Sequence, residues 1–71
     1  MTEQQLDHET RRHRFEVRWC LANGFEWFER YVKRVAERRG QEAAARLWKD
    51  VKTQHRLGNS GAAGEWKEET A

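Results

Sequence analysis

The sequence predicts an all-α fold, a helical hairpin of two or three helices. Apolar residues recur at spacings of three and four, the pattern of helix faces that pack on a core. Gly24 and Gly40 interrupt this pattern at points where a helix is expected to end. Most of the aromatic residues lie between Phe15 and Val51, so we expect the core to form from this stretch.

The first helix is expected to run to about residue 22, because neither Gly nor Pro occurs between Leu6 and Ala22. Thr2 is a candidate N-cap, with Gln5 at the capping-box position. Residues 15–21 also alternate between apolar and polar, which is typical of a strand. We favour the helix because no second alternating stretch is present to pair with such a strand.

The second and third helices are expected at residues 25–39 and 41–56. Asn23–Gly24 is a turn dipeptide. Gly40 follows two arginines, which are typical of a helix end, and precedes Gln41, where the next helix is expected to begin. The apolar face of the second helix consists of Phe25, Phe28, Val32, Val35 and Ala36. That of the third consists of Ala44, Leu47, Trp48, Val51 and His55. Residues 1–57 are therefore expected to form one helical hairpin domain.

Residues 58–71 are expected to form a flexible C-terminal tail, because Gly58 to Gly64 is rich in small residues. Trp66 interrupts this polar tail. Its side chain either docks on the helices or stays available to a partner, and docking is the favoured alternative.

A chain of 71 residues buries only a modest share of its apolar surface on its own. Its single cysteine, Cys20, has no partner for an internal disulfide, so oligomerisation is the remaining means of stabilisation. Aromatic side chains on several helix flanks would leave an apolar patch too large for a monomer, so we expect a two-fold homodimer. The expected dimer interface consists of Phe15, Val17, Trp19, Leu21 and Phe28.

Several function classes are disfavoured by the composition. No apolar stretch approaches the length of a membrane span, and the start of the chain lacks the apolar segment of a secretory signal. The three histidines and Cys20 lack the spacing of a zinc site, and no Gly-rich phosphate loop is present. We therefore expect no metal, no cofactor and no enzymatic activity. An unpaired cysteine fits a reducing cytoplasm.

Direct DNA binding is a second possibility, because basic residues outnumber acidic ones between residues 11 and 39. Ala36 to Gly40 has the spacing of a helix-turn-helix turn. However, Arg46 occupies a position that is apolar in that motif, and Ala43 to Ala45 offers no polar base-reading residue. We therefore expect no direct nucleic-acid contact. A DNA-binding protein would use Arg11 to Arg18 and Arg30 to Arg39.

One flank of the second helix has the composition of a protein-binding surface. It combines aromatic and arginine side chains, which are enriched at interface hot spots. The expected partner-binding residues are Trp27, Arg30, Tyr31, Arg34 and Arg38. The alternative is that Trp27 and Tyr31 belong to the dimer core or are half-buried flank residues.

Three stretches carry a resemblance to a known family: RRHRFEVRWCLAN, ERYVKRVAERRGQEAAARLWKDV and GNSGAAGEW. Over residues 11–66 the chain resembles the small anti-quorum-sensing, anti-activator proteins that transposable phages of Pseudomonas make early in infection. The resemblance implies an all-helical homodimer that binds host proteins in the host cytoplasm. The implied targets are the DNA-binding domain of a LuxR-type quorum-sensing activator (LasR) and the ATPase that extends type IV pili (PilB). The resemblance transfers no contact residues, because its motifs are spacings of Arg, Trp and Gly.

We therefore expect a phage-encoded inhibitor that acts by protein–protein binding. A DNA-binding domain presents basic residues, and this chain has a net charge of +2, so simple mimicry of DNA is disfavoured. A steric block through an aromatic patch is the favoured mode. The alternative function is a small phage DNA-binding transcriptional regulator, and a virion or packaging component is a third class.

Overall fold

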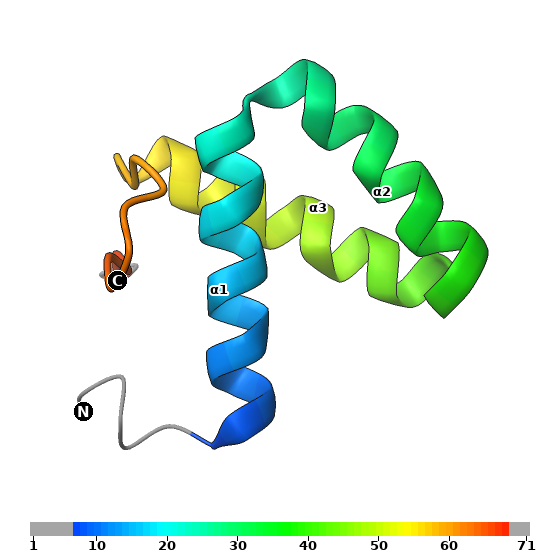
Figure 1. The fold of residues 1–71 in the computed structure, drawn as a ribbon, viewed down its shortest axis with the longest axis horizontal. Helices are drawn as coiled ribbons and strands as arrows, with labels where there is room; N and C mark the ends of the chain where they lie inside the picture. The colour runs from blue at the N-terminus through cyan, green and yellow to red at the C-terminus, as the bar shows by residue number, and fades with distance from the viewer. Residues whose placement is uncertain (1–6, 69–71) are drawn as a thin grey trace.

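The computed structural model describes residues 7–68 of the chain. Within this range the chain forms no strand and three α-helices, α1 (His8–Asn23), α2 (Phe25–Arg39) and α3 (Gln41–Arg56) (Figure 1). The all-α prediction is confirmed, and the structure has three helices rather than two. The stretch with strand-like alternation lies inside α1.

α1 begins at His8 and is capped by Asp7. One carboxylate oxygen of Asp7 accepts a hydrogen bond of 2.8 Å from the backbone N–H of Thr10, and the other accepts one of 2.9 Å from the Thr10 hydroxyl. These bonds lower the pKa of Asp7, because they stabilise the ionised carboxylate. The cap expected from the sequence, Thr2 with Gln5, lies outside the described residues.

Gly24 and Gly40 are the joints between the helices, as the sequence predicts. Their φ angles are 87° and 95°, in a range that residues with a side chain rarely adopt. The N–H of Gly24 donates to the Leu21 carbonyl, and the Gly24 carbonyl accepts from the N–H of Phe28. Gly40 is bonded in the same way to residues of α2 and α3. Each glycine therefore ends one helix and begins the next, so that each connection is a single residue.

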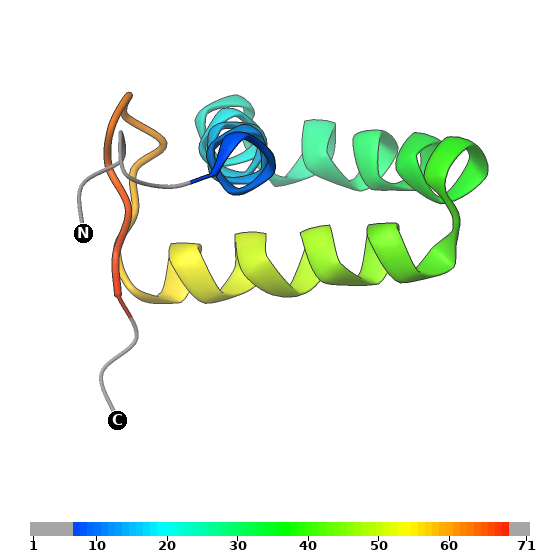
Figure 2. The same cartoon turned by 90° about the horizontal axis from the view of Figure 1, so that it is seen from below.

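α2 and α3 form an antiparallel pair, and α1 crosses it. In Figure 2, α1 is viewed nearly end-on and lies beside α2 in one layer, with α3 forming the other layer. The N-terminal half of α1 extends past the pair, as the lower part of Figure 1 shows. In the described part of the chain, no helix combines the length and the apolar character needed to cross a membrane.

The core lies where the three helices meet. Its buried side chains come from all three helices and are Val17, Cys20, Phe28, Val35, Ala44, Leu47 and Val51. Each large apolar side chain buried in this way contributes roughly 1.5–3 kcal/mol relative to its exposed state. Val17 and Phe28 are both 0% exposed, so a single chain already covers them completely.

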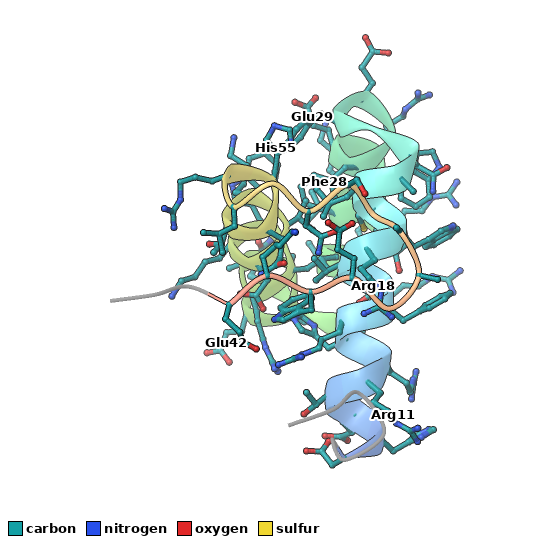
Figure 3. All side chains as sticks on the ribbon, turned by 90° about the vertical axis from the view of Figure 1, so that its left-hand side faces the viewer. Arg11, Arg18, Phe28, Glu29, Glu42 and His55 are labelled. Carbon is teal, nitrogen blue, oxygen red and sulfur yellow. The ribbon has the colours of Figure 1, made fainter. Side chains whose placement is uncertain are left out.

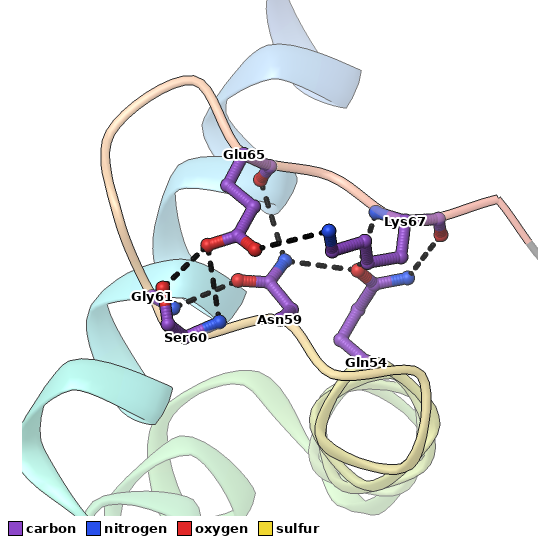
Figure 4. A network of polar contacts seen from close by, with 6 residues as sticks. All are labelled: Gln54, Asn59, Ser60, Gly61, Glu65 and Lys67. Carbon is purple, nitrogen blue, oxygen red and sulfur yellow. Dashed lines mark hydrogen bonds and ion pairs between the residues drawn. The ribbon is translucent and has the colours of Figure 1, made fainter.

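The C-terminal segment, residues 57–68, is held against α3 by a network of hydrogen bonds (Figure 4). The Gln54 amide donates to the Lys67 carbonyl at 2.7 Å and accepts from the Lys67 N–H at 2.9 Å. The same Gln54 oxygen accepts from the Asn59 amide at 2.9 Å. Glu65 accepts from both the N–H and the hydroxyl of Ser60. The composition predicts a flexible tail here, whereas the hydrogen bonds that join Gln54 to Asn59 and Lys67 fix this segment on α3.

The same segment also lies against α1. A Cβ atom at Gly61 would come within 2.7 Å of the backbone nitrogen of Ala22 and of the carbonyl oxygen of Arg18, so the close approach requires glycine. Trp66 packs on the core, and the Arg14 guanidinium carbon lies 4.8 Å from the centre of its ring. Docking of Trp66, the favoured alternative, is confirmed.

Candidate functional site

Three aromatic side chains form a cluster where α1 and α2 meet. Trp27 and Tyr31 are one turn apart on α2, and their rings stack with centres 4.9 Å apart. Trp19 of α1 meets both rings edge-on, at 4.7 Å from Trp27 and 5.7 Å from Tyr31. We call Trp19, Trp27 and Tyr31 the aromatic cluster. Ring pairs in these arrangements contribute about 0.5–1.5 kcal/mol beyond the burial of their area.

The structure merges residues that the sequence assigns to two separate surfaces. Trp19 was expected at a dimer interface, and Trp27 and Tyr31 at a partner surface. All three belong to one cluster, in which Trp27 and Tyr31 are half-buried and Trp19 is 45% exposed. Phe15, one turn before Trp19 on α1, is 63% exposed and extends this aromatic surface.

The other expected site residues are distributed differently. Val17 and Phe28 lie in the core of the single chain and have no surface left for a second chain. Leu21 is half-buried and packs on the core. The three expected arginines of α2 are exposed but are not among the residues that line the groove described below; they are Arg30, Arg34 and Arg38.

The carboxylate of Glu16 connects α1 to α2 beside the aromatic cluster. Arg39 of α2 donates to Glu16 of α1 through both terminal nitrogens, at 2.6 Å and 3.3 Å. The Tyr31 hydroxyl also donates to Glu16. Burial by itself would raise the pKa of Glu16, but the hydrogen bonds from Arg39 and Tyr31 outweigh it and hold that pKa below its ordinary value. Burial and the bond to Glu16 raise the pKa of Tyr31 to about 12.

Sequence reasoning missed the role of Arg39. Residues Tyr31, Val35 and Arg39 are each four apart, so they lie on one face of α2. Val35 is buried in the core, which means that Arg39 approaches α1 on the same side. The four-residue spacing from Val35 is the signal that distinguishes Arg39, which reaches Glu16, from Arg38, which does not line the groove described below.

An open groove of about 700 Å³ runs along the projecting half of α1. We call it the basic groove, because five arginines line it against two glutamates. The arginines come from all three helices and are Arg11, Arg12, Arg18, Arg39 and Arg46. Phe15, Trp19 and Tyr31 supply its aromatic wall, which makes the groove continuous with the aromatic cluster. Figure 3 shows Arg11 at the far end of α1, away from the other two helices.

A second polar contact fixes α1 relative to α3. The Nε2 atom of His13 lies 2.5 Å from a carboxylate oxygen of Asp50, and both side chains are partly buried. His13 also lines the basic groove. Together with the link from Glu16 to Arg39, this contact holds the groove side of α1 in one orientation.

Groups that could carry covalent or metal chemistry are not assembled at this site. Cys20 is fully buried, and burial together with the charge of Glu16 raises its pKa to about 12, so its thiol is protonated at neutral pH. Among residues 7–68, no group of three or more His, Cys, Asp or Glu side chains is placed to hold a metal ion. What the site offers is exposed rings next to arginine side chains.

Comparisons of the chain with protein-family models, with curated proteins and with solved structures found no match.

Proposed function

We propose that this chain is a binding protein that acts by occupying a surface of another protein. The observation that carries the proposal is the exposed pair Phe15 and Trp19 beside an arginine-lined groove. Aromatic and arginine side chains are the groups that contribute most to binding at protein interfaces. Contacts between α1 and both other helices keep this surface in one arrangement, which reduces the ordering cost of binding. A function of this kind needs occupancy and no reacting group.

For the target, we propose a host regulator, with the chain acting as a phage-encoded inhibitor. The resemblance over residues 11–66 supports this assignment, and it favours the DNA-binding domain of a LuxR-type activator (LasR) in the host cytoplasm, with the pilus ATPase (PilB) as a second target. The arginines of the groove are poorly suited to the basic face of a DNA-binding domain. The chain would therefore contact an acidic part of that domain and sterically prevent the activator from binding DNA.

We also propose that the chain forms a homodimer, through Phe25 and Trp48. These rings are 37% and 40% exposed, and the Lys52 amine lies over both. A two-fold interface brings the same patch of both copies together. A two-fold interface at the basic groove would bring five arginines of each copy together, whereas at Phe25 and Trp48 the basic group over the rings is Lys52. Sedimentation at micromolar concentration should show a dimer that Trp48→Glu dissociates and Phe15→Ser does not; a monomer at every concentration would contradict this.

The target assignment can be tested in a mobility-shift assay with a LuxR-type activator bound to its operator DNA. Addition of the chain should release the DNA from the activator in proportion to the amount added. No band from a complex between the chain and the DNA should appear. Phe15→Ser should weaken the release, because it removes an exposed ring while leaving the core unchanged. An activator–DNA complex that survives a large excess of chain would contradict the assignment.

DNA binding is the second candidate function, and the observation that favours it is the exposed pair Arg11 and Arg12 on the projecting half of α1. Arginines on such a helix are suited to contact phosphates. A shift of duplex DNA by the chain alone, with a steep loss at raised salt, would favour this function.

A further inference from the structure

We propose that the basic groove binds an acidic segment of a partner protein, whose carboxylates meet the arginines while an apolar side chain packs on Phe15 and Trp19. This inference rests on the proposed function and names the partner chemistry for the same surface. It follows from the charge of the groove, the order of residues along α1 and the packing of the rings.

The groove carries more positive charge than its lining glutamates balance. The negative charge of Glu16 is already balanced by Arg39, from which it accepts two hydrogen bonds, and Glu16 accepts a third from Tyr31. Arg11, Arg12 and Arg46 are exposed and face this hollow from two helices, against the single exposed carboxylate of Glu9. Guanidinium groups pair with carboxylates through two parallel hydrogen bonds, so these three are suited to acidic side chains.

The residues along α1 are ordered so that positive charge lies at one end of the groove and aromatic surface at the other. Arg11, Phe15 and Trp19 are four residues apart and therefore lie on one face, over about 12 Å of the helix. This length matches a short peptide segment with acidic residues at one end and an apolar residue at the other. A bound apolar side chain would cover Phe15, which is 63% exposed in the free chain.

The packing of the rings favours a protein partner over a nucleic acid. Bases bind by stacking on open ring faces. Trp27 and Tyr31 are stacked on each other with an angle of 13° between their rings, and Trp19 meets them edge-on. The carboxylate of Glu9 in the groove would also repel a phosphate backbone. An apolar side chain needs only the exposed part of Trp19 and the ring of Phe15.

The test uses fluorescence anisotropy with two labelled peptides. One consists of Glu and Leu residues in a helical repeat, and in the other every Glu is replaced by Lys. Labelled duplex DNA of random sequence is the third probe. The chain should bind the Glu peptide, with the affinity falling at raised salt, and should not bind the Lys peptide. Tighter binding to the DNA than to the Glu peptide would overturn the proposal in favour of a nucleic-acid site.

A pair of matched double variants locates the binding. Arg11→Glu with Arg12→Glu should weaken binding of the Glu peptide by about tenfold or more. Lys33→Glu with Lys49→Glu makes the same change in net charge at exposed positions outside the groove, and should change the affinity by less than about twofold. An equal loss in both double variants would show that net charge alone attracts the peptide, which would overturn the groove as the site.

The same variants separate this inference from the proposed function. If Arg11→Glu with Arg12→Glu still releases the activator from its DNA as well as the unaltered chain does, the groove assignment fails and the inhibitor function stands. If the unaltered chain leaves the activator on its DNA but binds the Glu peptide, the inhibitor function fails and the groove assignment stands. Loss of the release in this variant, with release kept in the lysine variant, would support both.

Discussion

At the scale of single residues, Glu16 joins the two helices that carry the aromatic cluster. Its carboxylate accepts hydrogen bonds from Arg39 and Tyr31 of α2, and its side chain is only 18% exposed. A hydrogen bond to a charged group contributes about 1.5–3 kcal/mol, more than an exposed ion pair. The orientation of Tyr31 in the cluster therefore depends on the ionisation of Glu16.

This dependence gives a pH-dependent stability. The pKa of Glu16 is lowered in the folded chain, so its contribution is present above the ordinary glutamate pKa of about 4.3 and is lost as the pH falls through the lowered value. Glu16→Gln should reduce the free energy of unfolding by about 1–2 kcal/mol at neutral pH. The difference between the two proteins should vanish in acid. Urea unfolding at several pH values measures it, with exposed Glu37→Gln as the control that changes little.

Cys20 gives a second prediction at this scale. Its thiol is fully buried, with its pKa raised to about 12, so at pH 8 it is neither ionised nor accessible. A thiol reagent should therefore modify Cys20 only when the chain unfolds. In an Ala45→Cys variant, the added thiol on the exposed side of α3 should react at once and Cys20 slowly. Rapid reaction of both thiols in the folded protein would contradict the position of Cys20 in the core.

At the scale of elements, the C-terminal segment acts as a strap across α1 and α3. Its hydrogen bonds run to Gln54 on α3, and at Gly61 it approaches the backbone of α1 too closely for a side chain. Trp66 then covers part of the core. The segment has little apolar surface of its own, so its docking depends on these few contacts.

Two glycines of this segment form a matched pair for a test. Gly61 and Gly64 have φ angles of 88° and 80°, so an alanine at either position carries the strain of positive φ, about 1–2 kcal/mol. Only at Gly61 would the added carbon meet the backbone of α1. Gly61→Ala should therefore lower the denaturation midpoint more than Gly64→Ala and make residues 58–68 sensitive to protease. Equal effects of the two variants would show that the close approach to α1 is unimportant.

The elements differ in how well the sequence predicts them. The end of α1, both ends of α2 and the start of α3 follow from Gly24 and Gly40, because glycine at a joint is a local signal. The N-cap of α1 at Asp7 was missed, although Thr10, whose N–H it accepts, lies three residues later. The docked C-terminal segment was not predictable from composition. Its order depends on the contact of Gln54 with Lys67, which lies 13 residues later, and on a missing side chain at Gly61.

At the scale of the whole molecule, the surface is determined by how α1 crosses α2. The helical spacing correctly placed Trp27 and Tyr31 on one flank of α2, but it contains no information on which helix covers that flank. The crossing brings Trp19 onto them, moves Arg39 into the site and leaves Phe15 exposed on the projecting half of α1. Long-range contacts of this kind are the part of the site that a single sequence does not reveal.

The most direct test of the binding surface is the set of indole N–H signals in an NMR titration. The chain has four tryptophans, which lie at the aromatic cluster, between α2 and α3, and on the C-terminal segment. On addition of the Glu peptide, or of the activator domain, the Trp19 signal should shift most and the Trp27 signal less. The signals of Trp48 and Trp66 should stay in place. A shift of Trp48 or Trp66 with Trp19 unchanged would contradict the assignment of this surface.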